Sequence, residues 1–317
     1  MSTDPGPGER AGVLGWFFRL SPLMQAACFM VIASFGFQAM NGVIKHLSTE
    51  IHPFEIGFFR NIFGLVALAP FFVRYRLEVF RTEKFGLHLL RGAINVVSML
   101  CFFYAISIAP LAKLASLAFT LPLWVTVFAV IFLGERLRSR RILALVVGTI
   151  GALIIIRPGT EAMNLGSLLV LAGTAIWGLA LMTIKVLART ESNLSITAWA
   201  AVLLAAFSLP PALLHWTWPS PGEFAWLALV GGLGSLGVMA TAQAFRLAEA
   251  NALMPFDFFK LIWAAAIGYI FFAEVPDIWT WLGGAVIFLS TVYLGYRESQ
   301  LKKQGELKHE TGPVSQI

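Results

Sequence analysis

The sequence predicts an all-α integral membrane protein with ten transmembrane helices arranged as two inverted five-helix repeats. Of the 317 residues, 58% are hydrophobic and 13% are charged, whereas soluble domains have about 45–50% apolar and about 25% charged residues. The apolar residues come in blocks, and about 20 such residues are needed to cross the hydrocarbon core of a bilayer. This composition excludes a water-soluble protein, because there is too little charge to cover a globule of this size.

Charged residues, Pro and Gly divide the chain into ten apolar blocks. We predict spans at Pro22 to His46, Pro53 to Val73, Leu87 to Ala109, Pro110 to Leu133, Ile142 to Ile156, Leu165 to Leu187, Ser195 to His215, Phe224 to Leu247, Ala252 to Phe272 and Ile278 to Tyr296. Residues 1–21 are predicted to be a cytoplasmic N-terminal segment. The polar residues 297–317 are predicted to be a disordered cytoplasmic tail.

The basic residues indicate how the chain is oriented in the membrane. With these spans, most of the 23 Lys and Arg residues fall on one side, including the loops Arg74 to Lys84 and Arg136 to Arg141. The loop from His215 to Glu223 on the other side has neither Lys nor Arg. Because positively charged loops stay in the cytoplasm, both termini are predicted to be cytoplasmic, in a bacterial inner (plasma) membrane.

The two halves of the chain resemble each other at an offset of about 140 residues, so that Lys45 meets Lys185. The first repeat covers residues 22–157 and the second covers 158–296. Because each half has an odd number of spans, the second enters the membrane from the opposite side. Inverted repeats are an architecture of secondary transporters, in which the solute site lies near the midplane between the halves. Chance similarity between apolar helices is the alternative.

The stretch Phe103 to Gly159 resembles the EamA repeat of the drug/metabolite transporter superfamily. The similar parts are FYA followed by a short link, Pro122 in the fourth span, the Gly-Glu pair at 134–135 and the Gly-spaced fifth span. The second half has Ala-Glu at 273–274 instead. The resemblance implies two inverted five-helix bundles around a central cavity lined mainly by spans 1, 3, 4, 6, 8 and 9. Members with a similar first repeat carry solutes such as amino acids, riboflavin or S-adenosylmethionine.

Polar residues inside the spans are candidates for function, because they are costly in lipid and usually face a cavity or one another. On the first span, Ser34, Gln38, Asn41 and Lys45 share one helical face. This polar stripe is predicted to face inward. It either contacts the solute or forms hydrogen bonds that hold the helices together.

Charged residues lie within three other spans. Asp257 and Lys260 are three residues apart on one face of span 9, close to Pro255, which can kink the helix. If buried, each charge requires the other, and a structural ion pair is the alternative to a solute site. Arg60, two turns into span 2, is interpreted mainly as structural support that bonds to backbone carbonyls or another span. Arg91 is expected to extend its charge to the interface.

The predicted cavity is aromatic, with neutral hydrogen-bonding groups beside the rings. Trp124 and Trp263 occupy equivalent repeat positions, and Trp177 lies within span 6. Such a pocket suits a planar or apolar organic solute with a few polar groups, although ordinary packing is the alternative for each residue. The predicted solute-binding residues are Gln38, Asn41, Asn95, Tyr104, Trp124, Trp177, Gln243, Asp257, Lys260 and Trp263.

The function predicted from the sequence is secondary transport of a small organic metabolite by alternating access, with an amino-acid-like, flavin or nucleoside-derivative solute. The alternative is a membrane-embedded enzyme acting on a lipid or isoprenoid substrate. Such an enzyme typically needs clustered carboxylates, histidines or a metal site, and the three Asp residues are scattered. We therefore predict no catalytic residues, metal site or cofactor. The expected partners are a small-molecule solute and the lipid bilayer, with no nucleic acid and with a homodimer left open.

Overall fold

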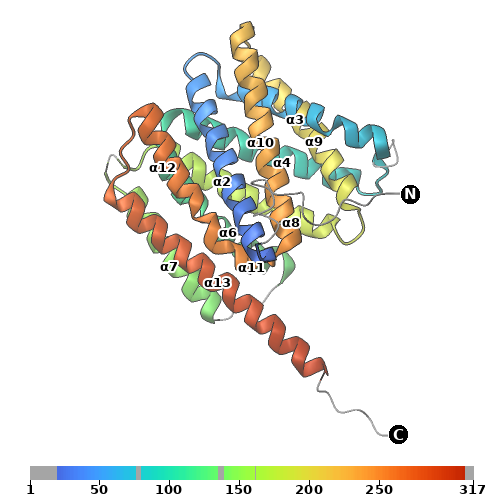
Figure 1. Cartoon of the computed structure of the whole chain (residues 1–317), viewed down its shortest axis with the longest axis vertical. Helices are drawn as coiled ribbons and strands as arrows, with labels where there is room; N and C mark the ends of the chain where they lie inside the picture. Colours follow the sequence, from blue (N-terminus) through green and yellow to red (C-terminus); the bar gives the residue numbers. More distant parts are fainter. Residues whose placement is uncertain (1–19, 76–79, 135–138, 161, 311–317) are drawn as a thin grey trace, which may run out of the picture.

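The computed structural model describes residues 20–75, 80–134, 139–160 and 162–310, and this part of the chain is helical without any strand (Figure 1). The helices are α2 (Pro22–Leu47), α3 (Pro53–Tyr75), α4 (Phe85–Ile108), α5 (Leu111–Ala118), α6 (Leu121–Leu133), α7 (Ser139–Ile156), α8 (Leu165–Leu187), α9 (Asn193–Leu213), α10 (Pro221–Leu247), α11 (Ala250–Asp257), α12 (Phe259–Phe272) and α13 (Ile278–Glu310).

Seven helical segments in the described part are long and apolar enough to cross a membrane. They are Pro22–Leu47, Phe85–Ile108, Leu111–Phe132, Leu165–Leu187, Leu194–Leu213, Pro221–Leu247 and Ala252–Phe272, and two shorter apolar helical segments are Ile142–Ile156 and Ile278–Tyr293. Two of the seven segments combine a pair of helices, α5 with α6 and α11 with α12. The prediction of an all-helical chain with several apolar helices of membrane-spanning length is confirmed.

Side-chain caps explain where several of these helices begin. The side chains of Ser21, Asn164 and Ser192 each accept a hydrogen bond from a backbone N–H in the first turn of α2, α8 and α9. At α10, Ser220 and Glu223 form a capping box. These side chains satisfy backbone donors that have no partner within the helix.

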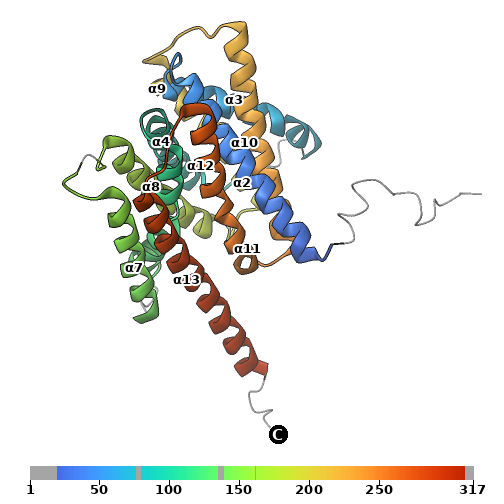
Figure 2. The same cartoon turned by 60° about the vertical axis from the view of Figure 1, so that its left-hand side comes forward.

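The helices pack mainly as pairs, with α2 along α10, α4 along α8, α3 along α9 and α7 along α13. Figures 1 and 2 both show α2 beside α10 and α7 beside α13. Small residues allow this close approach. A Cβ on Gly151 of α7 would lie 2.7 Å from Ile287 Cγ1, and a Cβ on Gly283 of α13 would lie 2.6 Å from the Gly151 carbonyl oxygen. The α7–α13 contact therefore depends on the absence of side chains.

Two of the membrane-crossing segments are broken near their middle. α5 ends at Ala118 and α6 begins at Leu121, whereas α11 and α12 are separated at Phe258. Pro255 lies inside α11, three residues before the second break. The Phe119 and Phe258 rings stack at the two breaks, with centroids 6.2 Å apart and an interplanar angle of 15°.

The C-terminal part of α13 extends into the stretch predicted as a cytoplasmic tail. The helix continues to Glu310 and projects beyond the bundle (Figure 2). Its sequence ESQLKKQGELKHE is rich in good helix formers, and it extends a helix that is already nucleated. Residues 1–19, which make up most of the predicted N-terminal segment, and residues 311–317 lie outside the described residues, as do residues 135–138 with Glu135 of the Gly-Glu pair.

Arg91 differs from the expectation. Its side chain is buried rather than extended to the interface, and Nη1 donates to the Ile196 carbonyl oxygen of α9 at 2.7 Å. This bond is available because α4 packs against α9. Arg91 therefore ties two helices together.

Candidate functional site

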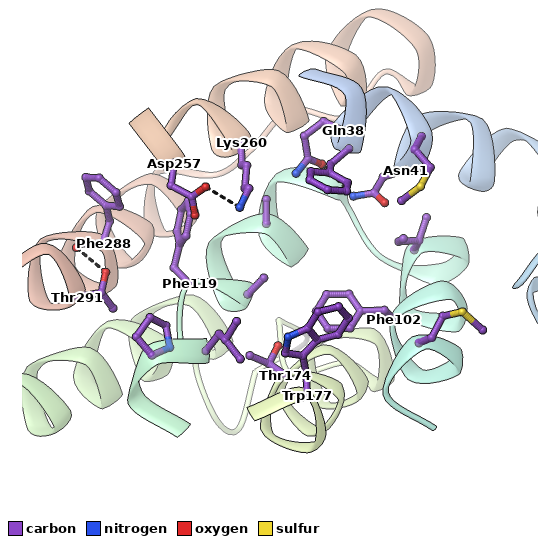
Figure 3. A pocket seen from close by; sticks show the side chains of 18 of the residues that line it. Gln38, Asn41, Phe102, Phe119, Thr174, Trp177, Asp257, Lys260, Phe288 and Thr291 are labelled. Atoms are coloured by element: carbon purple, nitrogen blue, oxygen red, sulfur yellow. Dashed lines mark hydrogen bonds and ion pairs between the residues drawn. The ribbon is translucent and has the colours of Figure 1, made fainter. Parts of the chain in front are cut away.

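A cavity of about 370 Å³ lies between the helices of the two halves (Figure 3). Its volume is within the range of small-molecule sites, about 300–1,000 Å³. The wall is mostly apolar, with a few polar groups. The lining residues are Phe37, Gln38, Met40, Asn41, Arg60, Met99, Phe102, Phe103, Ile106, Ala115, Ala118, Phe119, Leu121, Pro122, Thr174, Trp177, Met254, Asp257, Lys260, Phe288, Thr291 and Val292.

The polar stripe of α2 contributes two amides to this wall. Gln38 and Asn41 both line the cavity, and Asn41 Nδ2 donates to Gln38 Oε1 at 3.1 Å. Ser34, one turn earlier, instead lines a neighbouring groove between α2, α10 and α11. The polar face of α2 thus lines both the central cavity and the neighbouring groove.

Asp257 and Lys260 form an ion pair across the break between α11 and α12. Lys260 Nζ lies 2.6 Å from Asp257 Oδ1, and each side chain is one-third exposed, at 33%. Asp257 is the last residue of α11 and stands just before the N-terminus of α12, where the helix dipole favours a negative charge. Both residues line the cavity and the neighbouring groove, so the pair lies between these two spaces.

Trp177 of α8 provides a large aromatic surface in the cavity wall. It is 41% exposed, and Figure 3 shows its ring beside Thr174 and Phe102, across the cavity from the Asp257–Lys260 pair. A planar group can stack on such a ring. The cavity therefore offers an aromatic face and charged groups on separate walls.

The other five predicted binding residues are not part of this lining, because packing turns them elsewhere. The Tyr104 ring lies with its centroid 6.1 Å from that of His52. Trp124 stacks on Phe128 of its own helix at 6.2 Å. The remaining three are Asn95, Gln243 and Trp263, all half-buried.

Trp263 has surroundings that the sequence does not indicate. Its ring packs edge-on against Phe35 at 5.2 Å, and its Nε1 is buried without a hydrogen-bond partner among the described residues. The repeat-related Trp124 lies against the backbone of Gly178 instead, where a Cβ would be 3.2 Å from Trp124 Cβ. Equivalent repeat positions thus have different surroundings.

Arg60 is the cavity residue that sequence reasoning undervalued. The sequence favours structural support for Arg60, and the structure places its side chain in the cavity wall. The expected bond to a backbone carbonyl is absent from the described contacts, and Nη1 donates to the neighbouring Asn61 Oδ1 at 3.2 Å. The signal in the sequence was an ionisable residue deep within a span without a carboxylate one turn away.

An ion pair joins the two halves at one end of the bundle. Lys45, at the end of α2, pairs with Glu274, which follows α12. Lys45 Nζ also donates to the Ala109 carbonyl oxygen at 2.7 Å, and the Leu111 N–H donates to Glu274 Oε2 at 2.8 Å. The sequence predicts Lys45 on the inward-facing polar stripe of the first span, but it gives no sign of this contact with Glu274. Their contact joins α2, the start of α5 and the end of α12.

The described residues contain no group of three His, Cys, Asp or Glu side chains that could hold a metal ion. Cys28 and Cys101 are free thiols. The polar groups of the cavity are instead amides and hydroxyls beside an ion pair and a guanidinium. A many-helix membrane protein that encloses a cavity of this kind has the form of a solute transporter.

The chain belongs to the EamA-like transporter family, whose model matches residues 24–157 and again 164–296. It is 31% identical to an S-adenosylmethionine uptake transporter of Rickettsia prowazekii, over 92% of this chain and 98% of the relative. It is 33% identical to a riboflavin transporter of Brucella anthropi, over 85% and 98%. A pseudopaline exporter of Pseudomonas aeruginosa is 27% identical, over 87% and 97%.

A solved crystal structure shares the fold, with a TM-score of 0.57 and 16% identity over 88% of this chain and 98% of the other. The family and the relatives make this chain a multi-pass bacterial membrane protein that transports a small metabolite. It is a transporter and not an enzyme, so the alternative of a membrane-embedded enzyme is set aside.

Proposed function

We propose that this protein is a secondary transporter that moves an amino-acid-like, flavin or nucleoside-derivative solute across the bacterial plasma membrane by alternating access. In this proposal ten spans form two inverted repeats, residues 22–157 and 158–296, and both termini are cytoplasmic. The solute binds in the central cavity. The observation that carries the proposal is a cavity of about 370 Å³ whose walls come from both repeats, with Trp177 on one side and Asp257–Lys260 on the other.

The pairing of the helices supports the inverted repeats. The repeats relate α2 to α8, α3 to α9, α4 to α10 and α7 to α13. Exchanging the halves then converts the α2–α10 contact into the α8–α4 contact, and both contacts are extensive. The α3–α9 and α7–α13 contacts are converted into themselves. This pattern is expected of two bundles related by an axis in the membrane plane.

The broken helices support a solute site at the midplane. Transporters with inverted repeats often bind solute where spanning helices are interrupted, because the freed backbone groups and helix ends can interact with polar groups. Here the breaks at Phe119 and Phe258 face each other, and Asp257 lies at one of them. The Asp257–Lys260 pair of the cavity thus lies at an interrupted helix.

The solute class follows from the walls of the cavity. Trp177 and the Phe side chains favour a planar or apolar group, and the amides of Gln38 and Asn41 can accept or donate hydrogen bonds. The names of the related S-adenosylmethionine and riboflavin transporters agree with this chemistry. Sugars and inorganic ions fit such walls poorly.

Alternating access requires the Lys45–Glu274 contact to open in part of the cycle, because it joins the two halves at one end of the bundle. Glu274→Gln is expected to leave solute binding intact and to change the proportion of molecules closed at that end. Labelling of a cysteine introduced at Ala109 by an impermeant thiol reagent would then be faster. Equal labelling rates in the two proteins would argue against this contact as a gate.

Transport by the purified full-length protein in liposomes tests the proposal. We expect saturable uptake of radiolabelled tryptophan, riboflavin or S-adenosylmethionine, accelerated by the same solute inside the vesicles. Trp177→Ala should raise the apparent Kd about tenfold or more, since stacking contributes about 0.5–1.5 kcal/mol beyond burial of the ring. Trp226→Ala is the matched control, because Trp226 is similarly exposed, at 43% against 41%, and packs on His46 away from the cavity.

If none of these solutes moves or competes, and a sugar or an inorganic ion is carried instead, the proposed solute class is wrong. If Trp177→Ala and Trp226→Ala have the same effect on uptake, the cavity is not the binding site.

A further inference from the structure

Arg60 presents a guanidinium group to the central cavity, and no carboxylate among the described residues is paired with it. It lies on α3, and its described hydrogen bond is from Nη1 to Asn61 Oδ1. Gly234 of α10 packs beside the guanidinium, since a Cβ there would stand 3.6 Å from Nε and 3.7 Å from Nη2. Because a guanidinium carries five N–H donors, donors remain for a ligand.

Asn61 positions Arg60 without altering its charge. Asn61 Nδ2 faces two oxygens of α9, Leu204 O and Ser208 Oγ, each at 3.2 Å. These acceptors orient the amide so that Oδ1 points to Arg60. The guanidinium is thus held in place by a neutral group, and its positive charge is left without compensation.

Five described carboxylates within or next to the spans have recorded partners other than Arg60. Their recorded partners are Thr217 for Glu55, Lys260 for Asp257, Lys45 for Glu274, Arg157 for Asp277, and Thr82 for Glu191. An uncompensated charge within a membrane protein is costly. The Arg60 guanidinium, held in a cavity large enough for a solute, is therefore suited to bind an anionic group of that solute.

We propose that Arg60 is a specificity-determining residue that binds a carboxylate of the transported solute. This inference rests on the proposed transport function and narrows it to solutes with a carboxylate. The charges of the cavity favour a solute that presents one carboxylate group to Arg60: Asp257 and Lys260 neutralise each other, and Arg60 adds one positive charge. A carboxylate balances that charge and matches the planar guanidinium with two parallel hydrogen bonds. A dianionic phosphate would leave negative charge unbalanced.

The first test needs no variant and compares matched ligands on the full-length protein. Binding of L-tryptophan and of L-tryptophanamide is measured by competition and by thermal shift, together with S-adenosylmethionine and its decarboxylated form. The acid of each pair is expected to bind about 10- to 100-fold more tightly than its partner, the usual effect of a charge-assisted hydrogen bond. Equal binding within both pairs, or no binding of any carboxylate, would overturn the proposal.

Arg60→Gln and Arg60→Lys separate ligand binding from structural support. Arg60→Gln should abolish the preference for the acid. Arg60→Lys should keep part of it, because Lys retains the positive charge but cannot donate two parallel hydrogen bonds as a guanidinium does. Without ligand, Arg60→Gln should be at least as stable as the natural protein, since it removes an uncompensated charge. The control is Arg91→Gln, which removes a buried bond to a backbone carbonyl and should lower stability while keeping the preference for the acid.

If Arg60→Gln weakens the acid and the amide equally and lowers the melting temperature, Arg60 is structural and the proposal fails. Riboflavin and its 5′-phosphate form the third pair. Preference for the phosphate over all carboxylates would also overturn the proposal. Saturable transport of riboflavin by both the natural protein and Arg60→Gln, without preference for any acid, would refute the carboxylate site alone. The absence of any saturable transport would refute the proposed function itself.

Discussion

Replacing Asp257 by Asn tests the ion pair that lies across the break between α11 and α12. Exposed ion pairs contribute about 0–1 kcal/mol, whereas breaking a fully buried pair costs about 3–5 kcal/mol. The two side chains are one-third exposed and 2.6 Å apart, so we expect the pair to contribute about 1–2 kcal/mol. Asn at this position also lacks the negative charge that interacts favourably with the N-terminus of α12, which lowers stability by a further amount of about 0.3–1 kcal/mol. Asp257→Asn should therefore lower the free energy of unfolding by about 2 kcal/mol.

The assay is a double-mutant cycle on the purified protein, with Asp257→Asn, Lys260→Gln and the double variant. The coupling energy should be about 1–2 kcal/mol, and solute uptake per folded Asp257→Asn molecule should fall at least about tenfold, because Lys260 then adds an unbalanced charge to the cavity. Asp277→Asn is the matched control. It breaks the similarly exposed Arg157–Asp277 pair outside the cavity, and should lower stability with normal uptake per folded molecule.

Additive effects, with a coupling energy below about 0.5 kcal/mol, would refute the mutual dependence of Asp257 and Lys260. Normal uptake by Asp257→Asn with an unchanged pH dependence would exclude a transport role for this carboxylate.

Three further predictions concern orientation, packing and pH. A reporter fused after Arg297 should be active only in the cytoplasm, and activity on the outer side alone would refute the ten-span topology. Gly151→Leu should destabilise the protein by about 1–3 kcal/mol in an unfolding assay, because a side chain would collide with Ile287, and unchanged stability would contradict this packing. Burial and the stacked His215 ring lower the pKa of His52 below the ordinary value of about 6.5. Unfolded molecules therefore take up a proton at His52 more readily than folded ones, so the free energy of unfolding should fall as the pH drops from about 6.5 toward the lowered pKa. His52→Asn should reduce this acid-induced fall in melting temperature, and an identical pH profile would contradict it.

Local information was sufficient for the membrane class and for two parts of the site. Hydropathy is a property of contiguous residues, so the apolar helical segments follow from composition alone. The pairing of Asp257 with Lys260 and the shared face of Gln38 and Asn41 depend on spacing within one segment, and the structure brings each pair together.

The tertiary structure decided which residues of the apolar helices face the cavity. These helices are apolar on nearly every side, so no amphipathic pattern distinguishes a lipid-facing ring from a cavity-facing one. Trp177 therefore lines the cavity while Trp124 packs on Phe128, although both are mid-span tryptophans. The contact of Lys45 with Glu274 and the position of Arg60 depend on helices far apart in the chain. Such contacts are set by how the helices dock and not by the spacing of residues along any one of them.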